Sequence, residues 1–190
     1  MSQPPAPPLL LASTSPRRRE ILEQLRIPFD VVAPDYEETE EDPVAHAIGK
    51  ARSVLARADG RPVLGCDTEV VCGGRVYGKP DGPEAAEEML ESLSGRTHEV
   101  VAGLALITPA WEELHSEVTR VSFRELTPRD IAWYVASGEW EGRAGGYAIQ
   151  GRGAALVERI EGDYLNVVGL PVGLLVRLLA ERFPGTYGFG

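Results

Sequence analysis

Residues 9–25 read LLLASTSPRRREILEQL, and this stretch decides the fold. The apolar run at 9–12 is typical of a buried strand. Three hydroxyl residues follow it, any of which could cap a helix, and Pro16 suits the first helical turn, where a missing N–H costs no hydrogen bond. Beyond Pro16 the apolar residues recur at helical spacing. The stretch therefore predicts a strand, a hydroxyl-rich turn and an amphipathic helix.

Three arginines, at 17–19, stand at the start of this predicted helix. Cations there oppose the helix dipole, which favours negative charge in the first turn. An anion bound among them would explain the arrangement, because amides, hydroxyls and guanidinium groups would converge on one phosphate-like group. On this local pattern alone, a solvated arginine run whose dipole cost is tolerated is an equal alternative.

Length and charge narrow the classes of protein. A chain of 190 residues with 43% hydrophobic residues fits one domain, or one domain with a subsidiary lobe, and can bury a sizeable core. The net charge of −10 argues against a protein that binds nucleic-acid polymers, which need a basic surface. A small phosphorylated ligand held by a few local cations remains compatible with it.

Cysteine usage and the chain ends complete the outline. Cys66 and Cys72 form no CxxC motif or Cys/His cluster, so we expect reduced core thiols of a cytoplasmic protein rather than a zinc site or a disulfide. No signal peptide or transmembrane span is predicted. We expect a disordered leader at 1–8, one domain at 9–183 and a loose tail at 184–190.

The rest of the chain predicts an α/β protein with a mixed sheet. Helices alternate with strands early in the chain, and antiparallel pairs dominate the middle. Further strands are predicted at 29–32, 62–71, 97–108, 116–125 and 154–160. Further helices are predicted from Pro43 with Asp42 as N-cap, at 83–93, from Pro128 to about 137, and after Pro171. A hairpin turn is predicted at Gly73-Gly74.

Two kinds of charged residue stand out along these elements. Asp67 lies in the middle of an apolar strand, which is costly unless the carboxylate is paired, bound to a metal or solvated in a cleft, so we expect it to be functional. Lys50 lies beside the apolar stripe of its helix and could reach over the edge of the core, although a surface lysine is the commoner outcome. Lys79, in a Gly-Lys-Pro loop, is expected to return towards the cleft of Asp67.

Other residues suit structural roles. His98 and His115 form no convincing metal pair, and His98 is expected to be a strand residue that is hydrogen-bonded locally. The glycine-rich segment 142–153 lacks the βαβ context of a dinucleotide fingerprint. We expect the aromatic side chains at 133, 134 and 140 to pack internally rather than stack on a base.

Six motifs, in this order, resemble those of the Maf family of nucleotide pyrophosphatases. They are LLASTSPRR (10–18), GCDT (65–68), GKP (78–80), SGRTH (94–98), AGGYAIQG (144–151) and NVVGLP (166–171). The resemblance extends from about residue 9 to 179. It implies hydrolysis of a nucleoside triphosphate between its α and β phosphates, with Mg²⁺ or Mn²⁺. It also implies a largely antiparallel, twisted mixed sheet with flanking helices and a cleft between two lobes, related to the inosine triphosphate pyrophosphatases. Members are cytoplasmic and often homodimers.

The resemblance also assigns roles to residues. The catalytic aspartate of the family matches Asp67, its helix lysine Lys50 and its loop lysine Lys79. Its phosphate-binding serine and arginine match Ser15 and Arg18. Its second acidic residue matches Glu38, so Glu38 and Asp67 are the expected metal ligands.

Three further positions distinguish substrate branches of the family. They are Arg17, Thr68 and Gln150, a set that resembles the branch acting on dTTP and UTP. In the branch acting on 7-methyl-GTP, Trp, Gln and Glu stand at these three positions instead. Glu69 departs from the family pattern, since many members carry an apolar residue there, and this bears only on the local metal geometry.

A mechanism and its alternatives follow from these residues. Asp67 is expected to activate a water for in-line attack at the α phosphorus, and the amide of Gln150 to pair with a pyrimidine edge. Gln150 could instead tie down the glycine-rich backbone. The competing class of function is a nucleotide-binding regulator of cell division that does not turn the nucleotide over.

Overall fold

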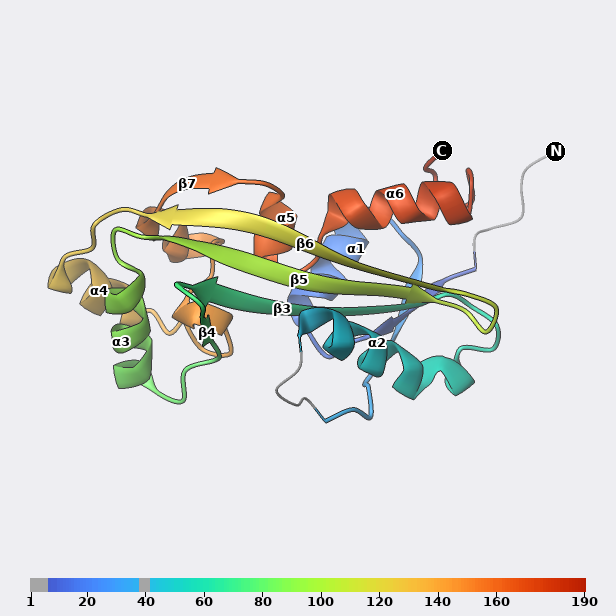
Figure 1. Ribbon diagram of the computed structural model, residues 1–190, viewed down its shortest axis with the longest axis horizontal. Coiled ribbons are helices and arrows are strands. Elements are labelled where there is room, and N and C mark those ends of the chain that lie inside the picture. Colours follow the sequence, from blue (N-terminus) through green and yellow to red (C-terminus); the bar gives the residue numbers. More distant parts are fainter. Residues whose placement is uncertain (1–6, 38–41) are drawn as a thin grey trace. The chain divides into compact units, whose positions relative to one another are not determined.

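The computed structural model describes residues 7–37 and 42–190 (Figure 1). The strands are β1 (Leu9–Ala12), β2 (Phe29–Val32), β3 (Val63–Cys72), β4 (Arg75–Tyr77), β5 (Thr97–Ile107), β6 (Glu112–Phe123) and β7 (Val157–Glu161). The α-helices are α1 (Pro16–Gln24), α2 (Pro43–Val54), α3 (Pro83–Leu93), α4 (Pro128–Val135), α5 (Tyr164–Val168) and α6 (Val172–Arg182). Short 3₁₀ turns are η1 (Leu55–Arg57), η2 (Ala144–Gly146) and η3 (Gly151–Leu156).

One mixed sheet joins the strands in the order β2-β1-β3-β5-β6-β7, with β4 paired to β3. Strand β1 is parallel to both β2 and β3, whereas the β3–β4 and β6–β7 pairs are antiparallel. The predicted α/β class with a mixed sheet and flanking helices is confirmed. Every helix within the described ranges is too short or too polar to pass through a lipid bilayer.

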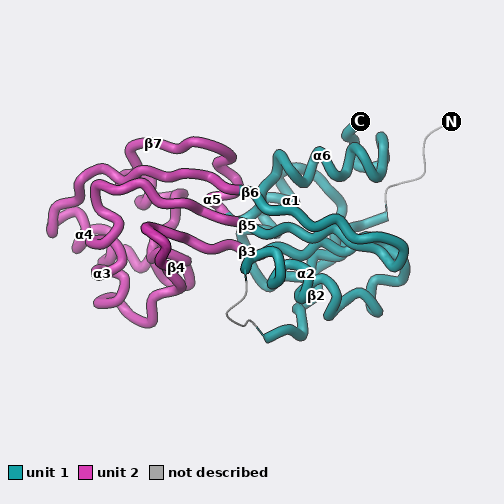
Figure 2. The backbone as a smooth tube through the Cα atoms, viewed as in Figure 1, with its two compact units in different colours: residues 1–67, 102–117, 169–190 teal, residues 68–101, 118–168 magenta. Residues whose placement is uncertain are grey.

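The chain forms two compact units, shown in different colours in Figure 2. Unit 1 consists of residues 1–67, 102–117 and 169–190, and unit 2 of residues 68–101 and 118–168. Both are discontinuous in sequence because β3, β5 and β6 each contribute one part to unit 1 and one part to unit 2.

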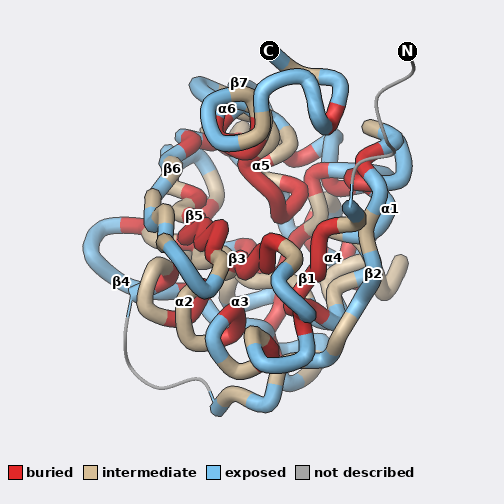
Figure 3. The backbone as a smooth tube through the Cα atoms, turned by 90° about the vertical axis from the view of Figure 1, so that its right-hand side faces the viewer, coloured by how far each residue is buried: buried red, intermediate tan, exposed pale blue. Residues whose placement is uncertain are grey.

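The core of unit 1 is built on β1, whose four residues are all buried (Figure 3). Helix α2 packs small residues, Ala47, Ala51 and Val54, against this strand and its neighbours. The approach is so close that a side chain at Gly65 would overlap the carbonyl oxygen of Ala47. The helix begins as predicted, because Asp42 Oδ1 accepts hydrogen bonds from the two amides at 44 and 45, at 2.8 and 2.9 Å.

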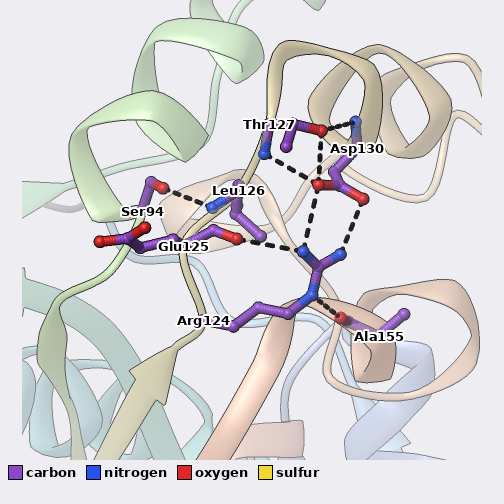
Figure 4. Close-up of polar contacts among 7 residues, drawn as sticks. All are labelled: Ser94, Arg124, Glu125, Leu126, Thr127, Asp130 and Ala155. Atoms are coloured by element: carbon purple, nitrogen blue, oxygen red, sulfur yellow. Dashed lines mark hydrogen bonds and ion pairs between the residues drawn. The ribbon is translucent and has the colours of Figure 1, made fainter.

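In unit 2, Arg124 joins the end of β6 to α4 and η3 (Figure 4). Its guanidinium donates to both carboxylate oxygens of Asp130, at 3.1 and 2.9 Å, and to the carbonyl oxygen of Ala155 at 2.8 Å. Asp130 in turn forms a reciprocal capping box with Thr127 at the start of α4. These bonds to the ionised form hold the pKa of Asp130 well below its usual value, with Arg124 as the largest cause.

The two largest errors in the predicted boundaries are the starts of two strands. The strand predicted from 116 begins at Glu112, because a tight turn at Thr108–Trp111 lets β6 pair with β5 at once. The strand predicted from 154 begins at Val157, because 151–156 coil into η3, where Gly153 lies so close to the Ala148 carbonyl that only glycine fits. The predicted loose tail contains one buried residue, Tyr187, whose hydroxyl donates to the Pro7 carbonyl at 2.9 Å.

Candidate functional site

Lys50 and Asp67 form a short ion pair in unit 1. The Lys50 ammonium donates to Asp67 Oδ1 at 2.5 Å, and the two side chains are 9% and 13% exposed. Lys50 therefore reaches over the edge of the core, and the alternative of a surface lysine is excluded. The ion pair also explains how a carboxylate is tolerated in an apolar strand, since each charge offsets part of the desolvation cost of the other.

Arg18 is fixed at the start of α1 by two hydrogen bonds. Its Nε donates to the carbonyl oxygen of Gly169 at 2.9 Å, and its Nη1 donates to Ser13 Oγ at 3.2 Å. Ser13 Oγ also accepts from the Ser15 amide at 3.1 Å. Ser15 is the N-cap of α1, but its side chain makes no capping hydrogen bond. The hydroxyl of Ser13 thus organises this turn.

The carbonyl of Gly169 connects Arg18 to the strand that carries Asp67. This oxygen also accepts from the thiol of Cys66, at 3.6 Å, and Cys66 precedes Asp67 on β3. Gly169 has φ +133°, a backbone conformation that other residues rarely adopt. Sequence reasoning assigned no role to Gly169, and its only signal was the NVVGLP motif.

These contacts lie just beyond the carboxyl end of β1. The last β1 residue, Ala12, pairs with Gly65, and Asp67 lies two residues further along β3. Because side chains alternate along a strand, Asp67 points to the side of α2, as Gly65 does, whereas Cys66 points to the side of Arg18. In open α/β sheets, ligands commonly bind outside the carboxyl ends of the strands. Figure 1 shows α2 and α6 on opposite sides of these strands.

The remaining predicted residues fall as follows. Ser15 and Arg17 are half-buried around the start of α1, in unit 1. Thr68, Lys79 and Gln150 belong to unit 2, where Thr68 is half-buried and the other two are exposed. Glu38 lies outside the described residues.

The arrangement of acidic side chains indicates which kind of metal ion the chain could bind. Within the described part of the chain, no three His, Cys, Asp or Glu side chains gather as they would around a structural zinc ion. Mg²⁺ and Mn²⁺ make smaller demands, because oxygen donors suit them and Mg²⁺ is commonly held by one or two carboxylates together with substrate phosphates. Asp67, a partly exposed carboxylate beside the ammonium of Lys50, fits that kind of site.

His98 is part of a buried aromatic cluster in unit 2. Its Nε2 shares a hydrogen bond of 2.8 Å with the Tyr147 hydroxyl, and both rings contact Phe123 edge to face. His98 does lie in a strand, but the prediction of a local hydrogen bond is wrong, since Tyr147 is 49 residues away. Burial lowers the pKa of His98 to about 4 and raises that of the Tyr147 phenol.

A pH dependence of stability follows from His98. Between its folded pKa of about 4 and the usual 6.5, the unfolded chain binds a proton that the folded chain does not. The unfolding free energy is therefore expected to fall as the pH drops from 6.5 to 4, by about 3 kcal/mol at most, and the full contribution is present above 6.5.

Urea unfolding of the wild type and of His98→Gln, which keeps a polar partner but does not titrate, measures this effect. The carboxylates titrate in both proteins, so their contribution cancels in the difference. Equal slopes of stability against pH in the two proteins would contradict the expectation.

Comparison with known proteins supplies independent evidence. The sequence matches a family described as "Maf-like protein" over residues 8–182. It is 50% identical over 180 residues to a dTTP/UTP pyrophosphatase of Gloeobacter violaceus, covering 91% of this chain and 95% of the relative. It is 44% identical over 191 residues to one of Deinococcus radiodurans, covering 97% of both. The structure resembles that of the Staphylococcus aureus Ham1 protein, with a TM-score of 0.57, 14% identity and coverage of 93% of this chain and all of the other, which shows a shared fold.

Proposed function

The chain belongs to the Maf family, and from this premise we propose that it hydrolyses dTTP and UTP to a nucleoside monophosphate and pyrophosphate. The relatives that bear the name dTTP/UTP pyrophosphatase match nearly the whole chain over nearly their own full length, which supports the same activity for this chain. The observation that carries it is the Lys50–Asp67 pair, which keeps a carboxylate and an ammonium together beyond the end of β1. Within unit 1 the pair is linked to the proposed phosphate-binding turn, because Arg18 and Cys66, the residue before Asp67, both donate to the Gly169 carbonyl.

In the proposed reaction a water attacks the α phosphorus and gives a proton to the carboxylate of Asp67. The bond between the α phosphorus and the bridging oxygen breaks, and pyrophosphate leaves with the electron pair. Lys50 fixes the orientation of the carboxylate and adds positive charge beside it. The guanidinium of Arg18, held by Ser13 and Gly169, is already oriented towards a single position, so little conformational entropy is lost when it binds phosphate.

We also propose that Mg²⁺ or Mn²⁺ takes part, with Asp67 and Glu38 as its protein ligands. When bound, such an ion neutralises phosphate charge and orients the polyphosphate. Lys79 adds a further cation from the loop after β4. A triphosphate carries nearly four negative charges, and cations must offset them before the water can approach.

Release of pyrophosphate tests the proposal. The purified protein is assayed with UTP, dTTP, CTP and 7-methyl-GTP, each with and without Mg²⁺. We expect turnover of UTP and dTTP that depends on the metal. Preferred turnover of 7-methyl-GTP would place the chain in the other branch, and tight binding of UTP without any turnover would identify a non-catalytic regulator.

Gln150 gives a prediction about base selection. Its side chain is exposed and makes no capping hydrogen bond to η3, which it precedes. Replacing Gln150 by Glu removes the amide donor while keeping the shape of the side chain. We expect kcat/KM for UTP to fall about tenfold, as for one lost hydrogen bond in a binding site. Undiminished hydrolysis of UTP by this variant would count against base recognition at Gln150.

Two further expectations belong to the proposal. A cytoplasmic location supplies both the nucleotide pool and the reducing conditions that suit Cys66 and Cys72, which are both unbridged. A homodimer is expected from the family resemblance, and light scattering coupled to gel filtration tests it.

A further inference from the structure

We infer that the buried hydrogen bond between His98 and Tyr147 positions Lys79 and Gln150, and so sets how tightly and how selectively a pyrimidine triphosphate binds. The inference rests on the proposed function. It concerns two residues that touch neither phosphate nor base and that act through the segment 145–152. All the contacts that support it lie within unit 2.

The hydrogen bond is deeply buried, and together with the packing of the Tyr147 ring it fixes the position of that ring. His98 is 1% exposed and Tyr147 5% exposed, and their polar atoms are 2.8 Å apart. The Tyr147 ring meets Phe123 and His98 edge to face, with ring centres 4.8 and 5.4 Å apart. A hydroxyl buried in such surroundings is costly without its partner, so the bond specifies where the ring sits.

The position of the Tyr147 ring affects Lys79 through the two glycines that precede the tyrosine. The Gly145 amide donates to the carbonyl of Gly78 at 3.1 Å, and Gly78 immediately precedes Lys79. Both Gly145 and Gly146 have positive φ, at 71° and 68°, so the chain turns sharply between this bond and the Tyr147 ring. A shift of the ring therefore moves the amide that holds the lysine loop.

On the other side of Tyr147, towards the C-terminus, hydrogen bonds of the backbone fix the segment that carries Gln150. The Ala148 amide donates to the hydroxyl of the fully buried Tyr134 at 2.9 Å. Beyond Gln150, the Arg152 amide donates to Glu139 Oε2 at 2.8 Å. Gln150 itself is exposed, so its direction is set by these flanking anchors rather than by contacts of its own side chain.

Tyr147→Phe is the variant that tests the inference, because it removes the hydroxyl and keeps the ring. Tyr187→Phe is the matched control, since Tyr187 is also buried and also makes one hydroxyl bond, to Pro7, but lies in unit 1. Steady-state kinetics with UTP and CTP are measured well below the melting temperature of each protein.

For Tyr147→Phe we expect KM for UTP to rise about tenfold with kcat changed less than about threefold, the effect of one lost buried hydrogen bond on binding. The preference for UTP over CTP is expected to fall by a similar factor. Tyr187→Phe is expected to leave both within about twofold, although the two variants lose comparable thermal stability. A merely structural role would lower stability without changing KM or the preference.

Variants of His98 make the test independent of the tyrosine, and they decide the matter if Tyr147→Phe does not fold. His98→Leu is expected to reproduce the rise in KM, and His98→Gln, whose amide can still meet the hydroxyl, to restore most of the affinity. The double variant that combines His98→Leu with Tyr147→Phe should be no worse than either single change, because both changes remove the same bond.

The outcomes separate this inference from the proposed function. If the wild type hydrolyses UTP but Tyr147→Phe matches Tyr187→Phe, the positioning role is overturned and the proposed function stands. If the wild type releases no pyrophosphate from any of the four triphosphates, the proposed function is overturned, and the positioning role with it.

Discussion

Replacing Asp67 by Asn is expected to lower kcat for UTP by about 10²- to 10⁴-fold, the range for removal of a general base. The amide has nearly the volume of the carboxylate but cannot accept the proton of the attacking water. The change also removes the negative charge that lies 2.5 Å from the ammonium of Lys50 in the wild type. Single-turnover release of pyrophosphate at saturating UTP and metal measures the chemical step directly.

The matched control is Asp30→Asn, which changes an ion-paired aspartate of unit 1 outside the proposed site. We expect it to leave kcat within about twofold, as for an exposed pair of little energetic weight. Binding of UTP to Asp67→Asn, measured by calorimetry, is expected to persist, because the phosphate-binding cations remain. Full turnover by Asp67→Asn with unchanged metal dependence would show that Asp67 is neither base nor ligand.

Lys50→Met is expected to lower kcat/KM for UTP at least about 100-fold, since it removes a preorganised cation from a partly dehydrated site. It also takes away the ammonium that pairs with the Asp67 carboxylate, which is 13% exposed. Breaking a buried pair from one side costs about 3–5 kcal/mol of stability. Urea unfolding therefore accompanies the kinetics, and the assays are run where the variant remains folded.

Arg52→Met is the control for Lys50→Met, because Arg52 lies on the same helix but is exposed and paired with Glu112. It is expected to leave kcat/KM within about twofold. Combining Lys50→Met with Asp67→Asn should cost far less than the sum of the two changes, since each already disrupts the same pair. Additive losses in the double variant would show that the two residues act separately.

The elements that follow from local chemistry could be predicted from the sequence. Asp42 followed by Pro43 indicated the start of α2, and Gly73-Gly74 indicated the β3–β4 turn, because a cap and a primed turn depend only on neighbouring residues. The position of Asp67 on β3 followed from strand alternation. These inferences need no knowledge of tertiary contacts.

Contacts between distant residues could not be predicted in the same way. Whether the ammonium of Lys50 lies in water or at the core edge depends on how α2 packs against β3. The partner of His98 is 49 residues away, and the carbonyl of Gly169 reaches Arg18 across 151 residues. Local pattern says nothing of such partners, nor does it show that the Ser13 hydroxyl accepts from Arg18.

The burial of Lys50 has a practical consequence, because Lys50 and Lys79 are the only lysines in the sequence. The side chain of Lys50 is 9% exposed and forms an ion pair with Asp67, whereas Lys79 is exposed on a loop. An amine-reactive dye applied at moderate pH should thus attach at Lys79 in preference to Lys50, since a shielded, ion-paired ammonium is a poor nucleophile. The fold thereby supplies a single side-chain handle for an optical reporter, placed without engineered cysteines on the loop that we propose to meet the nucleotide.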